Sequence, residues 1–187
     1  IPFFTNKAFG DESSKKHLAI ELAAVLSVFF LIFRDFHLFT GEWTKYAFAI
    51  FAVVHLFRMY LWGNIRVLSK PILLILYIAY SCLPLAFFIK AFAHYEPMGG
   101  HTAVHALTAG LIGINILAMM TRVSLGHTGR PMQSSLWMNI SFILLFVGVL
   151  QRVLWPILDN TKFFEAILWS SGLWTLAFLI NLNVFTP

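Results

Sequence analysis

Histidines and arginines inside apolar stretches are the residues of this sequence best able to do chemistry. His55 and Arg58 stand three positions apart in one apolar run, and they share a helix face. His101 and His105 stand four apart at the start of another run. A buried neutral imidazole can ligate a metal or haem iron, and a guanidinium can bind a haem propionate or an acidic side chain. Because polar groups are costly inside a membrane, these residues are functional candidates.

Each candidate also has a simpler interpretation. Arg58 can snorkel to the membrane interface, and a lone His55 is more often a satisfied core histidine than a ligand. His101 is typical of a solvated interfacial residue, and the segment 102–104 lacks the glutamate of a zinc-protease helix. For His105, a ligand and a hydrogen-bonded core histidine remain equally open.

Small residues follow His105 in the same run. Ala106 and Gly110 are four positions apart, as are Ala109 and Gly113. Such pairs let another helix, or a flat ligand, approach closely. We favour ordinary helix packing for the glycines.

A basic segment with two glycines follows this run, and in it His127 lies between Arg122 and Arg130. Such a segment could hold an anion or haem propionates. On the residues alone, a basic cytoplasmic loop with turn glycines is the leading interpretation. The segment lacks the GK[ST] ending of a phosphate-binding loop.

The elements that must position these residues are apolar runs. The chain has 187 residues, of which 59% are hydrophobic and 11% charged, whereas soluble domains carry about 25% charged residues. Six runs are close to the ~20 residues that cross a bilayer, and in lipid they must be helical. The sequence predicts one all-α transmembrane domain over 1–187, a lipid-embedded bundle of about six helices at 17–33, 44–62, 71–92, 101–121, 136–157 and 163–185.

Charge placement gives the orientation and excludes some functions. Positive residues gather in the N-terminal segment and after the second and fourth runs, which predicts both termini on the cytoplasmic side. No basic run is typical of a nucleic-acid patch, so we expect no such partner. Cys82 is the single cysteine, so an internal disulfide and covalent c-type haem attachment are excluded.

The segment from Met119 to Pro131, MMTRVSLGHTGRP, resembles the signature of the NnrS family. The preceding HALTAG at 105–110, the His55-x-x-Arg58 unit with Trp62, and the opening IPFFT are also similar to that family. The resemblance implies a multi-pass protein of bacterial inner membranes that contains non-covalent, b-type haem and copper. It also implies a role in nitric oxide response, denitrification or resistance to nitrosative stress, with nitric oxide or a related small molecule as ligand.

The resemblance further implies that this chain is the second half of a protein of about twelve helices. Its partners would be the other half or other membrane subunits. The resemblance implies that the metal ligands are His55, His105 and His127, which stand at matching positions of this sequence. It also implies that Arg58, Arg122 and Arg130 contact the cofactor. His101 falls outside the family pattern. Tyr77 stands where a histidine is expected, so it would ligate ferric iron or mark a lost site.

Two other classes of function remain open at this point. One is half of a transporter or channel, although Glu21 is the sole plausible carboxylate within a run. The other is a membrane scaffold subunit whose histidines only pack. Whether the protein is an enzyme is undecided by the sequence.

Overall fold

The computed structural model describes residues 1–10, 14–63, 65–92 and 99–186, which form helices and turns without a strand. This confirms the predicted all-α class. The α-helices are α1 (Pro2–Phe9), α2 (Leu18–Asp35), α3 (Trp43–Trp62), α4 (Pro71–Phe92), α5 (Gly99–His105), α6 (Ile114–His127), α7 (Leu136–Leu158) and α8 (Phe163–Asn183). A π-helix, η3 (Ala106–Gly113), joins α5 to α6, and η1 (Ile65–Ser69) and η4 (Asn160–Lys162) are short 3₁₀ turns.

Four of these helices are long and apolar enough to cross a membrane: Pro71–Phe92, His101–His127, Leu136–Leu158 and Phe163–Asn183. They make the chain a multi-pass membrane protein. The other two predicted runs are also helices, α2 and α3. Both carry charged residues within their apolar sequence, and their membrane crossing stays a prediction, as does the orientation.

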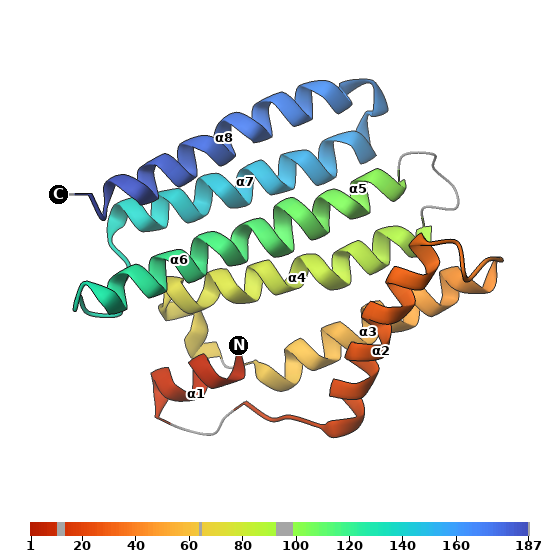
Figure 1. Ribbon diagram of the computed structural model, residues 1–187, viewed down its shortest axis with the longest axis horizontal. Coiled ribbons are helices and arrows are strands. Elements are labelled where there is room, and N and C mark those ends of the chain that lie inside the picture. Colours follow the sequence, from red (N-terminus) through yellow and green to blue (C-terminus); the bar gives the residue numbers. More distant parts are fainter. Residues whose placement is uncertain (11–13, 64, 93–98, 187) are drawn as a thin grey trace.

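Figure 1 shows α4, the α5–α6 helix, α7 and α8 side by side in chain order, each antiparallel to the next. α3 packs against the other side of α4, and α2 crosses α3 obliquely. α4 therefore lies between two apolar clusters. One cluster joins α4 to α5–α8 and includes Ile75 and Leu145, and the other joins α4 to α2 and α3 and includes Phe48 and Phe87.

Two segments differ from the sequence prediction. The polar start contains α1, since Pro2 stands in its first turn and Gly10 closes it at φ 68°. The helix predicted to end at residue 121 continues to His127. The prediction of a loop from Arg122 was wrong, because Gly126 stays helical and only Gly129, at φ 65°, takes the left-handed turn.

Candidate functional site

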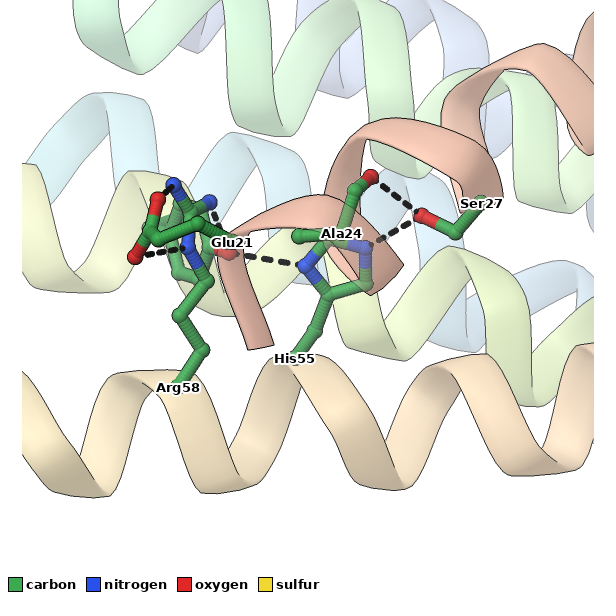
Figure 2. Close-up of polar contacts among 6 residues, drawn as sticks. Glu21, Ala24, Ser27, His55 and Arg58 are labelled. Carbon is green, nitrogen blue, oxygen red and sulfur yellow. Dashed lines mark hydrogen bonds and ion pairs between the residues drawn. The ribbon is translucent and has the colours of Figure 1, made fainter. Parts of the chain in front are cut away.

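His55 lies in a hydrogen-bonded polar cluster formed by α2, α3 and α4. α3 places the ring between α2 and α4, where the residue is 1% exposed. Its Nε2 lies 2.8 Å from Ser27 Oγ and its Nδ1 lies 2.7 Å from Tyr80 Oη, and the ring stacks on Phe87 with centroids 5.3 Å apart. Both ring nitrogens of His55 therefore have partners within the protein (Figure 2).

Arg58 lies one turn further along α3 and joins the same cluster. Its Nε donates to Glu21 Oε1 at 3.0 Å, and its Nη2 donates to Glu21 Oε2 in a bidentate ion pair (Figure 2). Its Nη1 donates to Tyr80 Oη at 2.8 Å, and the guanidinium lies 4.3 Å from the Trp62 ring centroid. The acidic side chain predicted as a possible partner of Arg58 is Glu21.

The hydrogen bonds of this cluster place the proton of a neutral His55. Ser27 Oγ donates to the Ala24 carbonyl at 2.7 Å, so it accepts from His55 and the imidazole proton stands on Nε2. His55 Nδ1 then accepts from Tyr80 Oη, which itself accepts from Arg58 because a guanidinium only donates. His55 is a neutral core histidine in this arrangement, with no free lone pair to offer a metal.

His105 ends α5 and lies on the other side of α4 from His55. The ring is half-buried, packs near Phe163 at 6.0 Å, and accepts at Nδ1 from Arg152 Nε of α7 at 3.3 Å. Because Arg152 can only donate, the proton of a neutral His105 stands on Nε2. His101, one turn earlier, is exposed, as the interfacial interpretation predicts.

The basic segment does not converge on one point. Arg122 lies on α6 with its guanidinium 4.2 Å from the Phe4 ring centroid. Arg130 donates to the Val184 carbonyl at 2.9 Å and so caps the end of α8. His127 is exposed at the last position of α6, and none of its ring nitrogens has a partner in the described part of the chain.

Tyr77 has a structural role in this arrangement. Its hydroxyl donates to the Trp62 carbonyl at 2.7 Å and lies 3.1 Å from Thr5 Oγ1. The residue thereby ties α4 to the end of α3 and to α1.

The expected metal ligands are dispersed rather than gathered. His105 and His127 stand at opposite ends of one continuous helical segment, roughly 30 Å apart at 1.5 Å per residue. His55 belongs to a different cluster across α4. Within the described ranges, no group of three or more metal-ligating side chains exists.

The glycines of the small-residue pairs serve close packing. A Cβ at Gly110 would lie 2.7 Å from Cys82 Sγ, and one at Gly113 would lie 3.1 Å from Trp174 Nε1. Neighbouring side chains already fill the space that a flat ligand would need at these two positions.

Sequence reasoning missed the role of Arg152. The structure joins this residue to His105, Ser170 and Ser171. The available signal was a single cation within the apolar run 136–157. The position of Tyr80 between His55 and Arg58 could not be read from spacing.

The fold and these clusters define the chain as a multi-pass, all-helical membrane protein with embedded ion-pair and histidine clusters. The sequence model of the NnrS protein family matches residues 1–187, so the chain belongs to that family. This confirms the resemblance found in the sequence and its link to the nitric oxide response. No curated protein and no solved structure matches the chain.

Proposed function

We propose that this chain acts in the bacterial inner membrane as a haem- and copper-binding protein of the nitric oxide response. The family match over residues 1–187 carries the proposal, since the resemblance ties that family to haem, copper and nitric oxide. Resistance to nitrosative stress and denitrification are the processes it would serve.

The three expected ligands fit this role unequally. His127 fits best, because both of its nitrogens are free of protein partners in the described part of the chain. His105 would have to lose its Nε2 proton, and His55 would have to break its bonds to Ser27 and Tyr80. His55 and His105 therefore do not fit a metal as they stand.

We infer that any one metal ion is bound by at most one of these three histidines. The three side chains lie in separate surroundings, so no two of them can meet at one ion without a large rearrangement. Further ligands would come from a partner subunit or from protein outside the described residues. The basic residues Arg122 and Arg130 remain the proposed contacts for propionates, although Arg130 already caps α8.

A pyridine haemochrome spectrum with metal analysis tests this proposal on protein expressed with haem and copper supplied. We expect both cofactors in the purified protein. His127→Ala should lose one of them while His101→Ala, the exposed control, retains both. Protein that contains neither cofactor would overturn the proposal. Unchanged spectra in His127→Ala would remove that residue from the ligand set.

The scaffold hypothesis has one specific observation in its favour. Every polar hydrogen of the His55 ring is used within the protein, as expected for a histidine that only packs. In that case His55→Ala would lower the melting temperature without changing haem or copper content. The transporter hypothesis gains no comparable support, because Glu21 is neutralised by Arg58.

A further inference from the structure

Arg58 and Arg152 both lie within long apolar helices, and their surroundings differ in charge. The first, Arg58, is neutralised by the Glu21 carboxylate. The second, Arg152 of α7, is bonded only to neutral groups: His105 Nδ1 at 3.3 Å, Ser170 Oγ at 3.3 Å and Ser171 Oγ at 3.4 Å. No carboxylate in the described ranges pairs with it. A guanidinium within a membrane helix is costly without a compensating negative charge.

The donors of Arg152 are only partly used. A guanidinium has five N–H groups, of which Nε uses one for His105 and Nη1 bonds the two serines. The two N–H groups on Nη2 have no acceptor in the part of the chain that is described. They leave Arg152 able to donate to an anionic oxygen placed beside Nη2.

A pocket of about 310 Å³ lies beside this guanidinium. It is lined by Thr108, Ala109, Arg152, Ser171, Trp174 and Thr175, from η3, α7 and α8. The lining holds no acidic side chain.

Trp174 and η3 also line this pocket. The indole Nε1 of Trp174 lies close to η3, since a Cβ at Gly113 would be 3.1 Å from it. η3, which contributes Thr108 and Ala109, is a π-helix, a rare form that is frequent at functional sites.

We propose that this pocket binds a small monovalent oxyanion group through Arg152 Nη2. The inference goes beyond the proposed haem and copper function and does not depend on it. An oxyanion accepts charge-assisted N–H bonds from a guanidinium, and its charge supplies the compensation that the protein lacks here. The lining hydroxyls add no free donors, because Thr108, Ser171 and Thr175 each donate to a carbonyl of their own helix.

Anion titration of the purified protein in a neutral detergent tests the site. The melting temperature is followed against sodium nitrite and sodium nitrate, with sodium chloride at equal ionic strength as reference. Because a ligand that binds the folded state stabilises it, we expect a saturable rise with the oxyanions beyond that with chloride. Arg152→Gln should raise the half-saturating concentration by at least ten-fold, since a hydrogen bond to a charged group contributes about that factor.

Matched variants separate the site from general effects. Lys162→Gln removes a neighbouring cation that lies outside the pocket and should leave the titration unchanged. Arg152→Lys keeps the charge but removes the Nη2 donors, so it should weaken binding even if Arg152→Gln fails to fold. Equal titrations in all variants would overturn the proposal.

The same oxyanion chemistry could come from the phosphate of a phospholipid, and mass spectrometry of the intact protein with its lipids separates the two sources. One anionic lipid retained by the wild type and lost in Arg152→Lys, with no response to nitrite or nitrate, would assign the oxyanion to a lipid headgroup. A response to free anions without a retained lipid would assign it to a soluble ion. If the protein shows no response to the free anions and retains no anionic lipid, the proposed site is overturned.

Discussion

Tyr80 connects Arg58 to His55 in the α2–α3–α4 cluster, so removing its hydroxyl tests the hydrogen bonds of the cluster directly. Tyr80→Phe removes one oxygen and leaves the ring in place. That oxygen accepts from Arg58 Nη1 at 2.8 Å and donates to His55 Nδ1 at 2.7 Å, and the residue is 8% exposed. No water can readily replace it, so one donor and one acceptor lose their partner.

The expected cost follows from these two bonds. Hydrogen bonds between membrane helices average about 0.6 kcal/mol, which gives a lower limit of about 1 kcal/mol for two. In soluble proteins a bond to a charged group contributes about 1.5–3 kcal/mol and a neutral one about 1 kcal/mol, which gives an upper limit of about 4 kcal/mol. We therefore expect Tyr80→Phe to lower the free energy of unfolding by about 1–4 kcal/mol.

Tyr60→Phe supplies the matched control, because the same chemical change falls on a residue that is 77% exposed. Its effect should stay within about 0.5 kcal/mol. Both variants are measured by reversible unfolding in mixed micelles, followed by circular dichroism. A double-mutant cycle with His55→Phe should give a coupling of at least about 0.5 kcal/mol. If the two tyrosine variants unfold alike, the hydroxyl does not bridge Arg58 and His55 and the proton assignment above is wrong.

Three further predictions concern packing between helices. Gly110→Ala should lower the free energy of unfolding by about 1–3 kcal/mol, because the added Cβ would overlap the side chain of Cys82. Gly172→Ala meets open space and should raise that free energy by up to about 1 kcal/mol. Both variants are measured by unfolding in micelles. Asn181→Leu should cost about 1–2 kcal/mol, since its buried amide bonds α6 and α7, while the exposed Asn183→Leu should be near neutral in the same assay. Cys82, 4% exposed, should resist a maleimide reagent until the protein unfolds, and rapid labelling of the folded protein, detected by mass spectrometry, would contradict the buried position.

The helices could be predicted closely from local sequence. The runs 44–62, 71–92 and 163–185 match α3, α4 and α8 to within two residues at each end. Apolar length specifies them, because a chain in lipid must satisfy its backbone hydrogen bonds within each helix. The prediction failed where helix ends depend on backbone conformation at single glycines: Gly126 continues a helix and Gly129 ends one, and the composition around them does not distinguish the two.

Membership of the NnrS family was also accessible from sequence, because a thirteen-residue signature is long enough to be specific. The same signature carried residues whose roles it could not assign. Arg122 and Arg130 are eight positions apart, yet one packs on Phe4 and the other caps α8. Their divergence depends on the neighbours that each meets in the folded chain.

The amino-acid sequence by itself thus determined the membrane class, the helices and the family of this protein, because these depend on apolar length and on contiguous motifs. Tertiary structure decided which polar side chains are satisfied. Glu21 and Tyr80 stand 37 and 22 positions from Arg58, and only the crossing of three helices brings them together around His55. The fold likewise left Arg152 without a counter-charge, since the partner of a buried cation is set by what packs against its helix.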